Sequence, residues 1–338
     1  MNAKERLFSI LNKESVDRPS CICPGGMMNM ITTGLMEQSG VFLPTAHTDA
    51  RAMAYLAKTA YTSGCFENVG VPFCMTVEAE SMGAKVNMGT EAIEPHVSEY
   101  VLTTTSDWAS LPSAEVHSGR SGVVLDAIEL LRAELPDVPI IGNLTGPVST
   151  ASSLIEPTIF FKELRKKNAD AHALMTHVTD HLIAFGLAQI EAGADIITIS
   201  DPSGTGEILG PKYFEEFTVT YLNRLIEPLK AAGAKVIVHI CGSMRQVYPQ
   251  ADQIISDVLS FDSIVPIREA RQALPERLLM GNISTYTLEF GEPEKVRILT
   301  DFAADNGFDI ISPACGLGMR SPLANIRTML EVLKEREE

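Results

Sequence analysis

The sequence predicts a (β/α)8 barrel, an α/β fold, formed as a single domain by all 338 residues. From about residue 137 onward, short runs of apolar and β-branched residues alternate with longer segments of helical periodicity. Strands separated by helices of this length pair in parallel through right-handed crossovers. About eight such units fit in the chain, as a closed barrel requires. No Gly-x-Gly-x-x-Gly motif follows an early strand, which disfavours an open dinucleotide-binding sheet.

The expected strands are short apolar runs that end in turn-forming or polar residues. They lie at residues 20–23, 69–73, 138–146, 194–202, 235–241, 261–265, 278–283 and 308–315. The main expected helices lie at residues 49–64, 122–135, 168–193 and 211–233. Gly193 and Gly233 close the last two, and Pro211 stands where a helix can begin. Residues 75–136 are less regular and are expected to hold a short β-excursion before the helix at 122–135.

The composition limits the classes of partner. The chain has 43 acidic and 27 basic residues and a formal net charge of −16, which argues against nucleic acid or an anionic membrane as a partner. No apolar run approaches the roughly 18–20 residues that a membrane-spanning helix needs. The first residues form a charged amphipathic segment rather than a secretory signal. Six cysteines are too sparse for a disulfide framework, so we expect a soluble cytoplasmic protein with reduced thiols.

Three residues are the strongest candidates for a chemical function. His239 and Cys241 end the strand at 235–241, and residues two apart on a strand point to the same side. Cys315 ends the strand at 308–315. Because active sites of (β/α)8 barrels lie at the carboxyl ends of the strands, all three are expected to meet at the barrel mouth. One imidazole and two thiolates suit Zn²⁺, and three protein ligands leave a fourth position open for a substrate.

Several alternatives stay open for these and neighbouring residues. The His-x-Cys pair could instead fill the core, or belong to a closed structural metal site in a non-catalytic corrinoid- or thiol-binding protein. In that second case Asp201, Glu207 or Cys23 would supply a fourth ligand. Asp201, which we also include among the candidate catalytic residues, could either cap the turn after its strand or support the site. Met27, in a Met-rich segment after the first strand, could line a cofactor surface or belong to the core.

Motifs along nearly the whole chain resemble the uroporphyrinogen decarboxylase superfamily, and this resemblance also implies a (β/α)8 barrel. They are Asp17-Arg18-Pro19, Gly146-Pro147, Glu191-Ala192-Gly193-Ala194-Asp195, Ser200-Asp201-Pro202-Ser203, His239-Ile240-Cys241-Gly242, Gly281-Asn282-Ile283-Ser284 and Pro313-Ala314-Cys315-Gly316. The His-x-Cys and Cys set is similar to that of the zinc-dependent methylcobamide:coenzyme M methyltransferases, which implies that His239, Cys241 and Cys315 are zinc ligands. True decarboxylases hold a tetra-acid substrate with an arginine-rich segment near the first strand. Residues 21–27 contain no arginine here, and burying unpaired carboxylates is costly.

The resemblance implies transfer of a methyl group from a methylated corrinoid to a thiol. Zinc deprotonates a bound thiol at neutral pH, and only the thiolate is a good nucleophile. We expect the methylcobamide to be carried by a separate corrinoid protein and the acceptor to be coenzyme M. Its sulfonate needs donors, for which the amides around Gly316 and the side chain of Arg320 are candidates; a solvated surface position is the alternative for Arg320. Tetrahydrofolate as the acceptor and a metal-free lyase of the decarboxylase type remain alternative functions.

Overall fold

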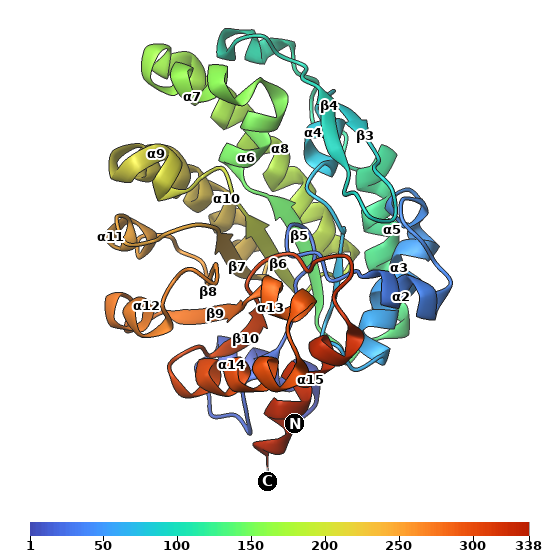
Figure 1. Ribbon diagram of the computed structural model, residues 1–338. Helices are drawn as coiled ribbons and strands as arrows, with labels where there is room; N and C mark the ends of the chain where they lie inside the picture. The colour runs from blue at the N-terminus through green and yellow to red at the C-terminus, as the bar shows by residue number, and fades with distance from the viewer. Residues whose placement is uncertain (338) are drawn as a thin grey trace.

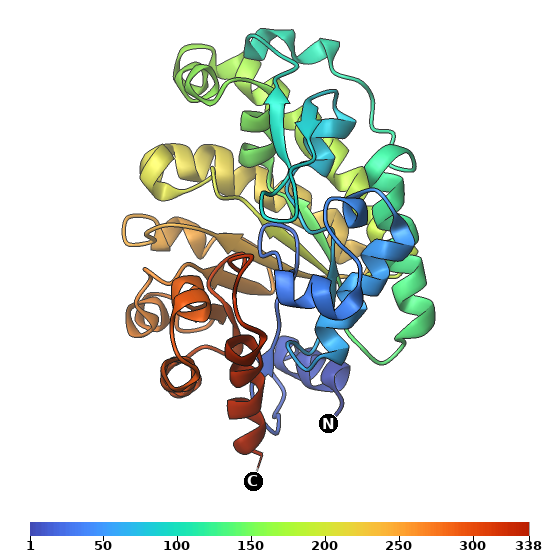
Figure 2. The same ribbon diagram turned by 45° about the vertical axis from the view of Figure 1, so that its right-hand side comes forward.

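The computed structural model describes residues 1–337, and at its centre eight parallel strands curl into a barrel (Figures 1 and 2). Around the sheet the strand order is β1-β10-β9-β8-β7-β6-β5-β2. The strands are β1 (Ser20–Cys21), β2 (Val69–Val71), β5 (Ile140–Thr145), β6 (Ile196–Ser200), β7 (Lys235–Ile240), β8 (Val258–Phe261), β9 (Leu278–Ile283) and β10 (Ile310–Pro313). The predicted (β/α)8 class is therefore confirmed.

Helices surround the sheet on its outer face and at its ends (Figure 1). They are α1 (Ala3–Leu11), α2 (Thr33–Ser39), α3 (Ala50–Thr62), α4 (Val77–Ser81), α5 (Gly119–Glu134), α6 (Pro147–Leu154), α7 (Pro157–Lys166), α8 (Asn168–Ala192), α9 (Gly206–Tyr213), α10 (Thr220–Ala231), α11 (Tyr248–Ala251), α12 (Ile267–Ala273), α13 (Thr285–Phe290), α14 (Pro293–Asp305) and α15 (Leu323–Glu335), with the 3-10 helices η1 (Thr45–His47) and η2 (Thr105–Ser110) and the π-helical turn η3 (Phe214–Val219). None of the helices in the described part of the chain is both long and apolar enough to cross a membrane.

The predicted helix ends agree with the backbone. Gly193 and Gly233 follow α8 and the end of α10 with φ values of +117° and +96°, a left-handed conformation that glycine adopts without the cost of a Cβ. Gly210, with φ of +69°, interrupts the helix before Pro211. The expected helix at 211–233 therefore begins where its proline indicated, but it passes through η3 before it becomes α10.

The irregular region between β2 and α5 contains the expected β-excursion. Strands β3 (Lys85–Asn87) and β4 (His96–Glu99) form an antiparallel hairpin outside the barrel sheet. The turn of this hairpin is held to the segment after β1, because the Asn29 side-chain amide donates a 3.4 Å hydrogen bond to Glu94. The hairpin turn thus reaches the carboxyl ends of the barrel strands.

One predicted strand is misplaced. The sixth strand was expected at 261–265, whereas β8 covers Val258–Phe261. Asp262 ends the strand, because its side chain accepts a 3.2 Å hydrogen bond from the backbone N–H of Ile264 within the following turn. The apolar pattern of Ile264 and Val265 imitated a strand but belongs to the loop.

Side-chain bonds and one backbone hydrogen bond, rather than a strand ladder, close the barrel between β1 and β2. Within residues 1–337, β1 pairs with β10 and β2 pairs with β5, but the two do not pair with each other. Buried Asn68 instead accepts from the Cys23 N–H at 2.9 Å and donates to the Cys23 carbonyl at 2.8 Å. The Glu67 N–H donates to the Cys21 carbonyl at 2.8 Å. Asn68 thereby replaces the backbone partner that a neighbouring strand would offer.

Buried Glu67 connects this closure to the amino-terminal helix. Its carboxylate receives a 2.7 Å bond from Arg6, two 2.8 Å bonds from Arg18 and a 2.9 Å bond from the Cys21 N–H. Both arginines are also buried. Charge-assisted bonds of this kind are about twice as strong as neutral ones, so the group fixes the first strand against the second.

Glu163 gives a pH-dependent contribution to stability. It accepts hydrogen bonds from the Thr105 N–H and hydroxyl at 2.7 and 2.8 Å and pairs with Lys167 at 2.9 Å. Burial alone would raise the pKa of this carboxyl, but these donors outweigh it and lower the pKa from 4.5 to about 2. A lowered folded pKa adds stability that is present above pH 4.5 and is lost as the pH falls toward 2. We expect Glu163→Gln to cost about 2 kcal/mol at pH 7.

Urea unfolding at pH 7, 4.5 and 3 measures this difference, and exposed Glu129→Gln is the control, for which no change is expected. A difference for Glu163→Gln that does not shrink as the pH falls would contradict the assignment.

Candidate metal centre

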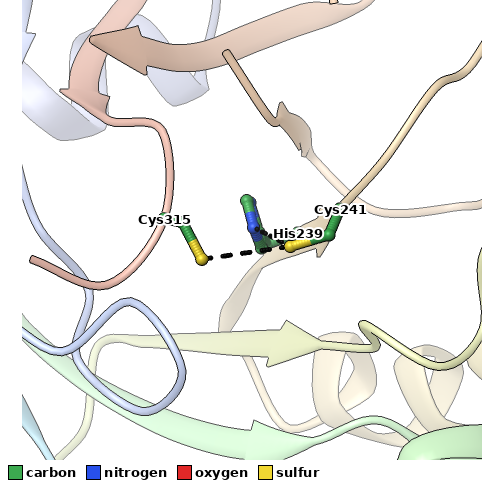
Figure 3. Close-up of side chains that lie close together, drawn as sticks. All are labelled: His239, Cys241 and Cys315. Carbon is green, nitrogen blue, oxygen red and sulfur yellow. Dashed lines mark hydrogen bonds between the residues drawn. The ribbon is translucent and has the colours of Figure 1, made fainter. Parts of the chain in front are cut away.

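The structure brings His239, Cys241 and Cys315 together at the barrel mouth (Figure 3). His239 is in β7, Cys241 directly follows β7, and Cys315 lies in the loop after β10. The Cys241 sulfur is 3.4 Å from His239 Nε2 and 3.9 Å from the Cys315 sulfur. All three ligand atoms lie within 4.8 Å of one another. They come from the ends of β7 and β10, and two other strands, β8 and β9, lie between these in the barrel. The fold itself therefore creates the cluster.

Two of the three separations fit a tetrahedral ion, and the third, between His239 Nε2 and the Cys315 sulfur, is at most 4.8 Å. Zinc–sulfur bonds of about 2.3 Å and zinc–nitrogen bonds of about 2.0–2.1 Å, at tetrahedral angles, place two sulfurs about 3.8 Å apart and sulfur about 3.5 Å from nitrogen. The observed 3.9 and 3.4 Å differ from these spacings by about the spread that real sites tolerate. The donor set of one imidazole and two thiols therefore suits zinc in its chemistry and in two of its three spacings.

The imidazole is oriented by a buried partner. His239 and Ser260 are in register on β7 and β8, and both are fully buried. His239 Nδ1 lies 2.9 Å from the Ser260 hydroxyl. When Nδ1–H donates to this oxygen, the lone pair of Nε2 faces the two sulfurs, which is the tautomer that a metal requires.

The two thiols influence each other strongly. A hydrogen bond from the Cys241 thiol lowers the pKa of Cys315, and the His239 side chain lowers it further. The same bond, together with burial and the charge of Asp262, raises the pKa of Cys241. The two pKa shifts have opposite directions because one thiol donates to the other, whereas a bound divalent cation would favour loss of both protons.

The backbone after Cys241 requires glycine. Gly242 has φ of +80°, and a Cβ at this position would collide with the Glu207 carboxylate. The Gly242 N–H lies 3.4 Å from the Asp262 carboxylate. Glu207 and Asp262 thus flank the cluster. Asp262 was missed in the sequence, although its place after the carboxyl end of β8 is the position where barrel enzymes carry functional residues.

Asp201 is not brought into the cluster. Its buried carboxylate accepts bonds from the Ser149 N–H at 2.8 Å, the Ser149 hydroxyl at 2.6 Å and the Val148 N–H at 3.2 Å, at the start of α6. Burial raises the pKa of Asp201, and the bonds from Ser149 and Val148 oppose that rise. Its backbone N–H donates to the His239 carbonyl at 3.1 Å. Asp201 therefore caps α6 and holds β6 beside β7 rather than contacting the cluster sulfurs.

The remaining candidate residues from the sequence lie at different places relative to the cluster. The Met27 carbonyl packs against Gly316, where a Cβ would lie only 2.6 Å from it, so the loops after β1 and β10 touch. Arg320 is exposed and makes no hydrogen bond or ion pair within residues 1–337, which matches the solvated alternative. Cys23 is buried and its thiol donates to the Met28 carbonyl at 3.1 Å, outside the cluster.

Glu94 is a second residue that the sequence did not reveal. It sits exposed at the turn of the β3–β4 hairpin, where its carboxylate accepts a 3.4 Å hydrogen bond from the Asn29 side chain. The Asn29 carbonyl in turn accepts a 2.9 Å hydrogen bond from the Leu317 N–H, which connects the hairpin turn to the loop that carries Cys315. Nothing in a polar hairpin turn signals that it folds back over a distant strand end.

The comparison with family models shows that the chain belongs to the uroporphyrinogen decarboxylase family, which agrees with the barrel fold. The model for Uroporphyrinogen decarboxylase (URO-D) matches residues 2–336. The resemblance noted in the sequence is thereby confirmed.

Individual proteins of this family are similar to the chain over nearly its whole length. The chain is 32% identical over 333 residues to the methylcobamide:CoM methyltransferase MtbA of Methanosarcina acetivorans, covering 98% of this chain and 97% of the relative. It is 32% identical over 338 residues to the methylcobamide:CoM methyltransferase MtaA of Methanosarcina barkeri, with the same coverage of 98% and 97%. The solved structure of a methyltransferase from Methanosarcina mazei has a TM-score of 0.92 and 29% identity, and the match covers 99% of both chains.

Proposed function

We propose that this protein transfers a methyl group from a methylcobamide, carried by a separate corrinoid protein, to the thiol of coenzyme M. The observation that carries the proposal is the cluster of His239, Cys241 and Cys315 at the mouth of the barrel. The names of the relatives supply the donor and the acceptor. The whole chain would act as one domain. A cytoplasmic location suits the six free thiols.

In this proposal His239, Cys241 and Cys315 hold a zinc ion. When bound, zinc lowers the pKa of an incoming thiol and keeps it as a nucleophilic thiolate. The residues of the chain prepare the position: Ser260 fixes the imidazole, and Gly242 permits the turn that aims the Cys241 sulfur at Cys315. Glu94 in the turn of the β3–β4 hairpin accepts from Asn29, whose carbonyl accepts from the Leu317 N–H in the loop that carries Cys315.

The test is a methyl-transfer assay with free methylcobalamin as donor. We expect the purified protein to methylate coenzyme M, to lose this activity after dialysis against a chelator, and to regain it with one equivalent of zinc. Tetrahydrofolate serves as the competing acceptor. Undiminished transfer after complete removal of metal would refute the proposal.

The Ser260 hydroxyl offers a milder test of the same site. We expect Ser260→Ala to weaken zinc binding by about 10- to 100-fold, as is typical when the outer partner of a ligating histidine is lost. Competition with a chromogenic chelator measures the affinity. Ser256→Ala is the matched control, because Ser256 is also buried but bonds Arg277 instead of His239. Equal zinc affinities for the two variants would contradict the role assigned to Ser260.

A further inference from the structure

Five exposed apolar side chains surround the mouth of the barrel, and we call them the apolar rim. They are Ile93, Ile208, Ile264, Tyr286 and Phe290, with exposed fractions of 57, 48, 59, 72 and 65%. Four of them lie in the segments that follow strand ends: Ile208 is in α9 after β6, Ile264 is in the loop after β8, and Tyr286 and Phe290 are in α13 after β9. Ile93 is in the turn of the β3–β4 hairpin.

The two aromatic residues form the most exposed part of the rim. The rings of Tyr286 and Phe290 pack on each other with centroids 4.9 Å apart, one turn apart on α13. Exposing two aromatic rings to water costs free energy that burial in an interface would recover. Clustered exposed aromatics are typical of the centres of protein interfaces.

Four acidic side chains lie next to the rim positions in sequence, and each contacts a loop that follows a barrel strand. Glu94 follows Ile93 and bonds Asn29. Glu207 precedes Ile208 and lies against Gly242, next to Cys241. The other two such acids are Asp262, which the Ile264 and Gly242 N–H groups approach, and Glu289, which lies against Gly318 in the loop after β10.

The basic side chains nearby offset little of this charge. Arg245, in the loop after β7, is paired with Glu269 at 2.9 Å. Arg320 is exposed and could cancel one of the four carboxylates. Apolar side chains and carboxylates thus alternate around the mouth, and the net charge there is negative. Such a surface favours a partner whose apolar patch is bordered by lysine and arginine.

We propose that the apolar rim and its four acidic neighbours form the docking surface for the corrinoid protein, and that this partner presents a basic face around its corrinoid. The inference rests on the proposed function, because a donor carried on a protein must bring its methyl group to the cluster that the rim encloses. The rim side chains touch the partner and not the reacting groups. They would therefore matter for a protein-borne donor and not for a free one.

The test compares two methyl donors with the same zinc-loaded enzyme: free methylcobalamin, and methylcobamide bound to a purified corrinoid protein. We expect the double substitution Tyr286→Ser and Phe290→Ser to lower kcat/KM for the protein-borne donor at least about tenfold. Turnover of free methylcobalamin should stay unchanged, which also shows that the variant is folded. Tyr55→Ser and Ile298→Ser, on exposed faces of α3 and α14, are matched controls with no expected effect on either donor.

The dependence of the transfer rate on ionic strength is a second, independent test of the docking surface. Raising the salt concentration from about 0.02 to about 0.5 M should slow transfer from the protein-borne donor, because it screens the attraction of opposite charges. The proposed docking surface would be overturned if the double variant lost activity equally with both donors, or lost none with either. It would also be overturned if the wild-type enzyme had no higher kcat/KM for the protein-borne donor than for free methylcobalamin. Failure of the wild-type enzyme to use any donor would instead refute the proposed function.

Discussion

Substitution Cys241→Ser is expected to lower kcat/KM for methylation of the thiol by at least about 1,000-fold, which corresponds to roughly 4 kcal/mol of transition-state stabilisation. The Cys241 sulfur is the member of the cluster that lies close to both others, 3.4 Å from His239 Nε2 and 3.9 Å from the Cys315 sulfur. A serine hydroxyl is a poor ligand for zinc at neutral pH, so the substitution removes the thiolate on which the ion depends. The assay uses free methylcobalamin, so that docking of a partner does not enter.

The folded state should survive this change. Cys241 is partly exposed and lies after the end of β7, outside the barrel core. We expect an unfolding midpoint in chelator close to that of the metal-free wild type. Cys65→Ser is the control, since Cys65 is a free thiol outside the cluster and its variant should keep both zinc and activity. Near-normal turnover by Cys241→Ser would refute the role of this sulfur.

Substitution Glu67→Ala is expected to cause the largest loss of stability, about 2–4 kcal/mol in the free energy of unfolding, because it removes the buried carboxylate that two arginines share. Arg6 keeps Asp17 and Arg18 keeps Glu337 as partners, but the donors that faced Glu67 lose their acceptor. Arg6 and Arg18 are both less than 5% exposed, and each donates to Glu67. The same carboxylate receives the Cys21 N–H at 2.9 Å, at the point where the barrel closes without a strand ladder.

Urea unfolding at pH 7 measures the effect. Glu67→Gln keeps the size of the side chain and should lie between Glu67→Ala and the wild type. Glu134→Ala removes an exposed partner of Lys58 and should cost no more than about 1 kcal/mol. If the free energies of unfolding of Glu67→Ala and Glu134→Ala differ by less than about 1 kcal/mol, Glu67 does not stabilise the closure between β1 and β2, and the role assigned to it is wrong.

The barrel could be predicted because its strands and helices each have a recognisable local sequence pattern. The apolar strands, the glycines after α8 and α10 and the proline at 211 each mark an element by its own sequence, and the parallel order follows from the alternation of strands and helices. The site was predictable for a related reason: His239, Cys241 and Cys315 follow strand ends, and a barrel brings all strand ends to one mouth.

The remaining features depend on contacts between distant segments. Asn68 closes the barrel through its side chain, and no periodicity shows that an asparagine replaces a strand partner. The boundary of β8 was misplaced because the apolar residues of the loop after Asp262 continue the strand pattern. Asp201 was ambiguous in the sequence, since a carboxylate after a strand can cap a helix or serve a site, and only the bonds from Ser149 show which helix it caps.

The most direct measurement of the central claim is the zinc content and zinc X-ray absorption spectrum of the purified protein. We predict about one zinc per chain, bound by one nitrogen and two sulfurs of the protein, with one further sulfur when coenzyme M is added. The Cys241→Ser and Cys315→Ser variants should each lose a sulfur neighbour or the ion itself. A wild-type protein without stoichiometric zinc, or with an ion whose sulfur neighbours do not change on addition of the thiol, would contradict the account.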